Sequence, residues 1–367
     1  MVWREWLVPL LLSCPVSLAA QSHAPPRRVQ VAEGIYLFVT PPYSDVGLDG
    51  SSVAILGDDG VVVFDANGTP AAAEAVLAGI RTLTRQPVRY LVLSHWHWDH
   101  WYGAEVYRRA FPGVRIVAQE KTRALMMGPA LAFNQPGLDS LLPQHIEAVA
   151  RRLAEVAAAD SAAPGVARLR EHLAADRFFL AQKRGVRHTI PDLTFGDSLT
   201  LRLGGRRIQV LHYDRAVTPG DAFLYLPRER VVITGDLLVN PMSFALGCYP
   251  SGWIRTLQRI RALDAKVIVP GHGEPLHDWA LLDAHLAIFR ELVRLGAEAK
   301  ARGETVEQAR ALAAASPRIR AGMLVLTRDD AGLNEAFGVY VVDWFLHRVF
   351  DELDGGLTDS IAPIPPH

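Results

Sequence analysis

Short apolar runs separated by turn residues occupy the first part of the chain. They are GIYLFVT (34–40), SSVAIL (51–56) and VVVFD (61–65), and a GDDG turn separates the last two. Runs of this length, rich in β-branched residues and bounded by turn residues, are typical of strands. The pattern therefore predicts antiparallel strands here.

The pattern then alternates between helices and strands. Residues 71–84 have the spacing of an amphipathic helix, and VRYLVLS (88–94) is almost wholly apolar, as in a strand buried on both faces. A short helix that ends near Arg109 and a strand at 114–119 are predicted next. Further strands are predicted at 199–203, 207–213, 222–227, 231–236 and 266–273.

Two segments are predicted to be mainly helical. Residues 141–183 are rich in Ala, Leu and Arg and interrupt the strand pattern as an insertion. Residues 277–352 form the second segment, in which Thr305 and Gln308 fit a capping box. We expect these C-terminal helices to pack against the insertion; covering the pocket and forming a dimer face are the alternatives.

The composition supports a large buried core and argues against polyanionic partners. The chain has 367 residues, 50% hydrophobic and 21% charged, with a formal net charge of −1. No Lys/Arg block stands out, whereas binding to nucleic acid or to an anionic membrane needs a basic face. We therefore expect a small-molecule substrate and no nucleic-acid partner.

Residues 1–20 have the layout of an export signal. Arg4 precedes a short apolar run at 7–12, and small residues come before the first polar position. No run approaches the roughly 18 to 20 apolar residues that a spanning helix needs. We expect an exported protein, periplasmic or secreted, without a transmembrane segment; a lipoprotein anchored through Cys14 is the alternative. Cys248 is then the one remaining cysteine, predicted to be buried.

The stretch LSHWHWDHWYG (93–103) concentrates potential metal ligands where a buried strand ends. His95 and His97 are two residues apart, so their side chains point the same way. Asp99 and His100 follow at once. Imidazole and carboxylate are ligands that Zn²⁺ prefers, and a site short of protein ligands keeps a position open for water.

Two more strand ends carry groups of the same kind. The sequence TGD ends in Asp236, and PGHG contains His272. Glycine beside each ligand lets the backbone approach a metal closely. Either motif alone would be an ordinary turn, but together with the first stretch they indicate one shared site.

The ordered motifs HWHWDH, TGD and PGHG, with Asp65 in VVVFDANGT, resemble the signature of the metallo-β-lactamase superfamily. The resemblance implies an α/β fold, an αββα sandwich of two sheets face to face with helices outside and a metal site at one edge. The expected organisation is an export signal at 1–20, a metallo-β-lactamase-like domain at 21–276 with a helical insertion at about 121–188, and a C-terminal helical extension at 277–367 packed on it.

The resemblance also implies roles for individual residues. Zn²⁺ is the implied cofactor, one or two ions, with iron as the alternative. Asp65 would be buried and would hold the motif loop. His95 and His97 would belong to the first metal position, Asp99, His100 and His272 to the second, and Asp236 would bridge both.

One position departs from the superfamily pattern. A third histidine ligand for the first metal is usual in the loop after RIQVLHY, where this chain has Val217. A valine cannot ligate, so the first position is either left with three ligands or completed by a nearby group. Asp214 and His212 are the candidates, although each also fits an ordinary structural role. The second position is complete, so a single-metal enzyme is a live alternative.

The implied reaction is hydrolysis of a carbonyl substrate, namely an ester, lactone, thioester or amide. A bound Zn²⁺ lowers the pKa of its water to about 7 and polarises the carbonyl, and Asp99 would orient that water and take its proton. Trp96, Trp98 and Trp101 alternate with the ligands, so we expect them to line a substrate pocket for an apolar acyl group; packing of the loop is the alternative.

Three other functions fit the same motifs. A β-lactamase is one, although an Asp in a TGD context is more like the thioesterase and lactonase branches. An iron-dependent oxidoreductase like the persulfide dioxygenases is the second. A binding protein whose first metal position has decayed at Val217 is the third, and the retained ligands argue against it.

Overall fold

We describe a computed structural model of the chain, which covers residues 24–43 and 49–361. The export signal expected at 1–20, with Cys14, lies outside the described residues, so export and lipid anchoring stay predictions. No helix in the described part of the chain is long and apolar enough to cross a membrane.

The first sheet has seven strands in chain order within the described residues. Its first four strands are antiparallel, as the alternating runs predict, and β4 to β7 are parallel. The strands are β1 (Arg27–Ala32), β2 (Ile35–Val39), β3 (Ser52–Gly57), β4 (Gly60–Phe64), β5 (Val88–Val92), β6 (Arg115–Gln119) and β7 (Leu193–Phe195).

The second sheet has five described strands in the order β12-β11-β10-β9-β8. Neighbours are antiparallel except β11 and β12, which run parallel. Parallel pairing brings the ends of β11 and β12 to the same edge. The strands are β8 (Ser198–Leu203), β9 (Arg206–Leu211), β10 (Phe223–Leu226), β11 (Val231–Gly235) and β12 (Val267–Pro270).

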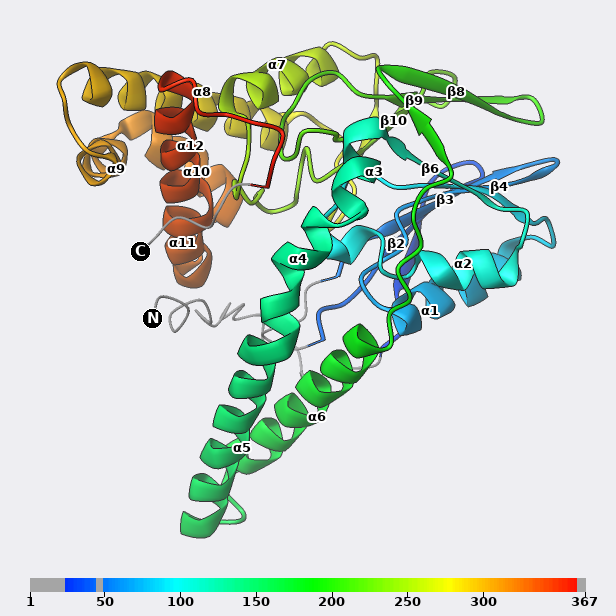
Figure 1. Cartoon of the computed structure of the whole chain (residues 1–367), viewed down its shortest axis with the longest axis horizontal. Helices are drawn as coiled ribbons and strands as arrows, with labels where there is room; N and C mark the ends of the chain where they lie inside the picture. Colours follow the sequence, from blue (N-terminus) through cyan, green and yellow to red (C-terminus); the bar gives the residue numbers. More distant parts are fainter. Residues whose placement is uncertain (1–23, 44–48, 362–367) are drawn as a thin grey trace.

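The two sheets pack face to face, with helices on both outer faces (Figure 1). Successive residues of a strand point to opposite faces. Val62 and Phe64 of β4 therefore pack against the second sheet, while Val61 and Val63 pack against helices. The predicted αββα sandwich is confirmed. Helices α1 (Pro70–Leu83) and α2 (Ala104–Ala110) cover the first sheet, and α7 (Pro250–Arg261) and α8 (Ala280–Ala301) cover the second.

The helical insertion between β6 and β7 ends in a long hairpin. Helices α5 and α6 pack along each other and project from the sandwich (Figure 1). Phe179 of α6 and Ile146 of α5 form a small apolar cluster with Tyr43 at the base of the hairpin. The elements are α3 (Glu120–Met126), α4 (Pro129–Pro136), the π-helix η3 (Gly137–Leu141), α5 (Leu142–Ala159) and α6 (Pro164–Arg184).

The C-terminal helices pack on the second sheet. Phe345 of α12 stacks on Phe289 of α8, with ring centroids 4.5 Å apart. The prediction that they pack against the insertion is wrong, because their buried side chains contact α7, α8 and the second sheet instead. The capping box of Thr305 and Gln308 is confirmed. These helices are α9 (Val306–Ala315), α10 (Pro317–Thr327), α11 (Ala331–Phe337), the π-helix η4 (Gly338–Asp343) and α12 (Trp344–Leu353).

Candidate metal centre

Six histidine and aspartate side chains converge where three strands end at one edge of the sandwich. Four of them follow β5, partly within the 3-10 helix η2 (Trp98–His100), and the others follow β11 and β12. Their ligand atoms form two groups, and within each group these atoms lie within 4.8 Å of one another. The first group is His95, His97 and Asp236, and the second is Asp99, His100 and His272.

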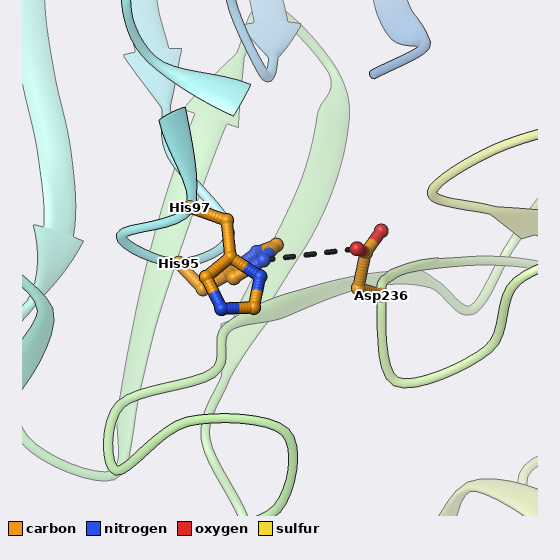
Figure 2. Close-up of side chains that lie close together, drawn as sticks. All are labelled: His95, His97 and Asp236. Atoms are coloured by element: carbon orange, nitrogen blue, oxygen red, sulfur yellow. Dashed lines mark ion pairs between the residues drawn. The ribbon is translucent and has the colours of Figure 1, made fainter. Parts of the chain in front are cut away.

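The first group sets two histidines opposite one aspartate. His95 and His97 extend from the loop after β5, and Asp236 faces them from the loop after β11 (Figure 2). The Nε2 atom of His95 lies 3.8 Å from Oδ2 of Asp236, and the two imidazole centroids are 4.4 Å apart. Two nitrogens and one oxygen therefore surround a space wide enough for a cation.

The second group is tighter and shares Asp236. The Nε2 atoms of His100 and His272 lie 3.2 and 3.1 Å from Oδ2 of Asp99. They also lie 3.3 and 3.5 Å from Oδ1 of Asp236. Because Oδ2 of Asp236 faces His95, the two oxygens of this carboxylate point to different groups. Asp236 is therefore placed to bridge two positions.

Buried Asp65 fixes the loop that carries four of the six residues. Its carboxylate accepts hydrogen bonds from the Ser94 backbone N–H at 2.7 Å and from the Ser94 hydroxyl at 2.8 Å. It also lies 2.7 Å from Nδ1 of His100. Hydrogen bonding at Nδ1 leaves Nε2 of His100 free to face the centre. Asp65 itself has a left-handed backbone, with φ of 61°.

Close backbone approach also shapes the centre. The φ of Gly235 is 54°, a left-handed conformation that favours glycine and turns the chain into Asp236. A Cβ atom on Gly271 would lie 2.0 Å from Oδ1 of Asp236. The glycines before Asp236 and His272 are thus steric requirements of the site.

Charges within the centre favour ionised carboxylates. Burial alone would raise the pKa of Asp99, but His100 and His272 hold it well below its ordinary value. Burial opposes a charge on His272, yet Asp236 and Asp99 raise its pKa to about 10. Burial, with the neighbouring His100 and His97, lowers the pKa of His95 well below its usual value. His95 is therefore neutral and has a lone pair for a metal.

The unsatisfied polar atoms of the centre fit a cation. Nε2 of His95, Nε2 of His100 and Oδ1 of Asp236 are buried and have no hydrogen-bond partner among the described residues. A buried polar atom without a partner costs roughly 1 to 3 kcal/mol. Imidazole nitrogens and carboxylate oxygens gathered in this way are a donor set for Zn²⁺ or a similar divalent ion.

Comparison with known families agrees with this centre. The family model described as the Metallo-beta-lactamase superfamily matches residues 46–272. The chain belongs to the metallo-β-lactamase superfamily. The matched region holds all six residues of the centre and ends at His272.

Two of the curated proteins that match this chain by sequence are enzymes with named activities. A linear primary-alkylsulfatase from Pseudomonas sp. is 27% identical over 252 residues, which cover 64% of this chain and 43% of that protein. A type 2 metallo-beta-lactamase from Bacteroides fragilis is 28% identical over 101 residues, 26% of this chain and 40% of that protein. The chain thus spans less than half the length of each of these two relatives.

Two solved structures share the fold of this chain. A metallo-beta-lactamase from Pontibacter korlensis superposes with a TM-score of 0.51 at 21% identity, over 72% of this chain and 99% of that chain. A stereoselective inverting sec-alkylsulfatase from Pseudomonas sp. superposes with a TM-score of 0.59 at 18% identity, over 93% of this chain and 52% of that chain.

The position that departs from the superfamily pattern lies beside the first group. Val217 is buried and lines a narrow crevice together with His97. Asp214 points elsewhere, because its carboxylate pairs with Arg255 at 2.6 Å. Nδ1 of His212 lies 2.8 Å from the backbone carbonyl of Asp221, and His212 belongs to neither group. Neither candidate therefore supplies the missing ligand in this structure.

The three tryptophans of the motif have three different environments. Trp101 is fully buried in the core, and its indole N–H donates to the Trp96 carbonyl at 2.8 Å, so it offers no surface to a pocket. The structure therefore contradicts the expectation that Trp101 lines the substrate pocket. Trp96 packs edge-on against His97 with centroids 4.5 Å apart. Trp98 is half-buried and lines a pocket on the side of the insertion.

Two buried charged residues near the centre were missed by sequence reasoning. Burial raises the pKa of Asp49 to about 7, and its carboxylate accepts from the Gly68 backbone N–H at 2.6 Å. Lys183 of α6 is buried against Trp98. Neither residue has a signal in the sequence, because a DG pair reads as a turn and a lysine in a polar helix reads as a surface residue.

Proposed function

We propose that the protein is a metal-dependent hydrolase of sulfate esters that carry an apolar group. The observation that carries this proposal is the convergence of six histidine and aspartate side chains in two adjacent groups. A centre of this kind supports hydrolysis by a metal-activated water. A sequence match to an alkylsulfatase over 252 residues supports a sulfate ester as the substrate.

The extent of the similarity favours this substrate over a β-lactam. The alkylsulfatase match extends over 252 residues, whereas the match to the Bacteroides fragilis enzyme covers 101. The alkylsulfatase structure also superposes over 93% of the chain, against 72% for the Pontibacter enzyme. This chain has C-terminal helices in addition to the sandwich, so a relative of the whole chain has to superpose on more than the sandwich.

The residues of the centre have separate tasks in this proposal. Asp99, His100 and His272 would hold one divalent ion tightly, and His95, His97 and Asp236 would hold a second more weakly because Val217 offers no ligand atom; Zn²⁺ is the ion proposed. A bound divalent ion supplies an acidified water and offsets negative charge on the substrate. The ionised Asp99 carboxylate would orient such a water and take its proton. The products are an alcohol and hydrogen sulfate.

Hydrolysis of a carbonyl ester, lactone, thioester or amide is the second candidate. A metal-activated water also attacks carbonyl carbons, and the half-buried Trp98 beside Asp99 suits an apolar acyl group as well as an alkyl group. Export to the periplasm or the medium is proposed from the first twenty residues. A dimer formed through the C-terminal helices is a further proposal.

The test is a substrate panel with purified, zinc-loaded protein. We expect sulfate release from hexyl sulfate, measured by ion chromatography, and little turnover of nitrocefin. The Asp99→Asn variant keeps the size of the side chain but loses the base, so sulfate release should fall by roughly 100-fold or more. Hydrolysis of hexyl acetate without sulfate release would select the carbonyl candidate. Oxygen uptake with glutathione persulfide, without hydrolysis of either ester, would contradict both.

A further inference from the structure

A pocket of about 200 Å³ lies between the helical insertion and the metal-binding loop. Trp98, which separates the ligands His97 and Asp99, forms one wall. The π-helix η3 and the start of α5 form the opposite wall with leucine side chains. The pocket is lined mainly by Trp98, Leu138, Leu141, Leu142, Phe179 and Lys183.

Lys183 places a cation against this apolar surface. Its Nζ lies 3.3 Å from the centroid of the Trp98 ring and 4.1 Å from that of Tyr102. Lys183 is 6% exposed, and no described residue accepts a hydrogen bond from its Nζ. An ammonium group has three N–H donors, and ring faces satisfy them only weakly. Lys183 therefore keeps hydrogen-bonding capacity for something outside the chain.

The neighbouring carboxylates are already engaged. Burial lowers the pKa of Lys183 well below its usual value, and the charges of Asp99 and Asp49 oppose this shift without cancelling it. The Asp99 carboxylate faces His100 and His272, and that of Asp49 accepts from the Gly68 backbone. Neither forms an ion pair with Lys183 among the described contacts. If Lys183 had only a structural role, its ammonium group would be buried without an acidic partner, which is costly.

We propose that Lys183 and this pocket bind the substrate, with the ammonium group on an anionic oxygen of a sulfate ester and the apolar group between Trp98, Phe179 and the leucines. This inference rests on the proposed function, because it names the sulfate as the anion. In this proposal the helical insertion binds the negative charge of the substrate through Lys183, and the loops at the strand ends carry the residues that catalyse hydrolysis.

The pocket also limits the size of the apolar group. Sites for drug-sized ligands occupy roughly 300 to 1,000 Å³, so a pocket of about 200 Å³ is small. Short alkyl or single-ring sulfates fit it better than long-chain detergents. We therefore expect hexyl sulfate to be bound more productively than dodecyl sulfate.

The first experiment measures binding without turnover. Hexanesulfonate resembles hexyl sulfate but has no ester bond to cleave, and its affinity for the zinc-loaded full chain is measured by calorimetry. Lys183→Met keeps the length and apolar character of the side chain, and we expect it to weaken binding by roughly 10-fold or more. Lys183→Arg should restore part of the loss. Lys266→Met, at an exposed lysine, is the matched control and should bind as the wild type does.

A second variant tests the pocket separately from the charge. Leu138→Trp adds volume to the wall formed by η3, an element that carries no metal ligand. It should weaken hexanesulfonate binding while binding of methanesulfonate, which has no chain to accommodate, stays unchanged. Equal affinity of wild type, Lys183→Met and Leu138→Trp for hexanesulfonate would overturn the inference.

The outcomes separate this inference from the proposed function. Lysine-dependent binding of hexanesulfonate without sulfate release from hexyl sulfate would support the binding site and contradict the sulfatase reaction. Sulfate release with an unchanged KM in Lys183→Met would support the reaction and contradict the site. A rise in KM at constant kcat in Lys183→Met would support both, because it marks lost binding at an intact centre.

Discussion

Val217 stands beside the first ligand group and offers no ligand atom to a metal. It lies beside His97, and neither Asp214 nor His212 replaces a ligand there. The first group therefore offers three ligand residues, one of which, Asp236, is also used by the second group.

Replacing Val217 with histidine should add a cation. In a calorimetric titration of metal-free protein with zinc, we expect tight binding to rise from about one ion per chain to about two, because an added imidazole completes a common zinc ligand set. Val217→Ala is the control and should titrate as the wild type does. Identical titrations of wild type and Val217→His would refute this account of the position.

Asp65 should control metal affinity from outside the ligand groups. Asp65→Asn keeps the shape and tolerates the left-handed backbone, but its amide loses an acceptor for Ser94 or His100. We expect zinc affinity to fall by roughly 10- to 100-fold, as measured by competition with a chromogenic chelator. Asp59→Asn, at an exposed aspartate that pairs with Arg89, is the control. Wild-type affinity in Asp65→Asn would contradict the role.

At the scale of single residues, the sequence predicted those side chains whose position follows from their spacing along the strands. His95, His97, Asp236 and His272 could be grouped because they follow strands whose ends share an edge. Trp101 was misplaced because alternation along a loop does not fix which side chains face inward: η2 turns this ring into the core. The environment of a helical residue such as Lys183 depends on tertiary packing, which no local pattern encodes.

At the scale of elements, a buried carboxylate joins two C-terminal helices. Glu291 of α8 accepts hydrogen bonds from Arg294 at 2.7 Å and from the Ser316 hydroxyl at 2.9 Å. Ser316 also caps α10, where its hydroxyl accepts from the Ile319 N–H. The hydrogen bond from Arg294 is the main cause that lowers the pKa of Glu291 to about 2, and Arg318 contributes.

This contact predicts a loss of stability in acid. A carboxyl group whose pKa is lower in the folded state stabilises the fold above its unfolded pKa, and the contribution disappears as the pH falls toward the folded value. We expect Glu291→Gln to lower the free energy of unfolding by about 1 kcal/mol at pH 7 and to be nearly neutral near pH 2. Urea unfolding measures this. Glu298→Gln, an exposed partner of the same arginine, should have little effect; equal losses in both variants would contradict the prediction.

Regular elements were predicted where periodicity was strong. The strands around β3, β4, β11 and β12 fall within a few residues of the predicted runs. Strand β7 has only three residues, too few to show a period. Helix α7 was missed although it is amphipathic, with one buried face. The packing of the C-terminal helices was wrong because an apolar helix face does not specify its partner.

At the scale of the whole molecule, the end of the described chain returns to the metal centre. Asp359 pairs with Lys121 at 2.8 Å and with Arg215 at 3.3 Å, and the Tyr249 hydroxyl donates to the Thr358 carbonyl. Ile361 then lines the crevice that contains His97 and Val217. Segments more than 200 residues apart thus shield the first ligand group.

A chain that ends at Gly356 should lose metal faster. Without residues 357–367, nothing from the C-terminus covers the crevice beside His97, so we expect zinc removal by excess chelator to accelerate several-fold in stopped-flow measurements. Asp359→Ala, which removes both ion pairs but keeps the segment, should show an intermediate rate. A rate unchanged by the truncation would show that this segment does not shield the centre.

The central claim is that strand ends of both sheets gather six side chains around divalent cations. The most direct measurement is metal content per chain, by mass spectrometry, of wild type and Asp236→Ala purified in the presence of zinc. We predict at least about one zinc ion per wild-type chain and a clear loss in Asp236→Ala, because its carboxylate faces both groups. A metal-free wild type, or equal metal content in the two proteins, would contradict the account.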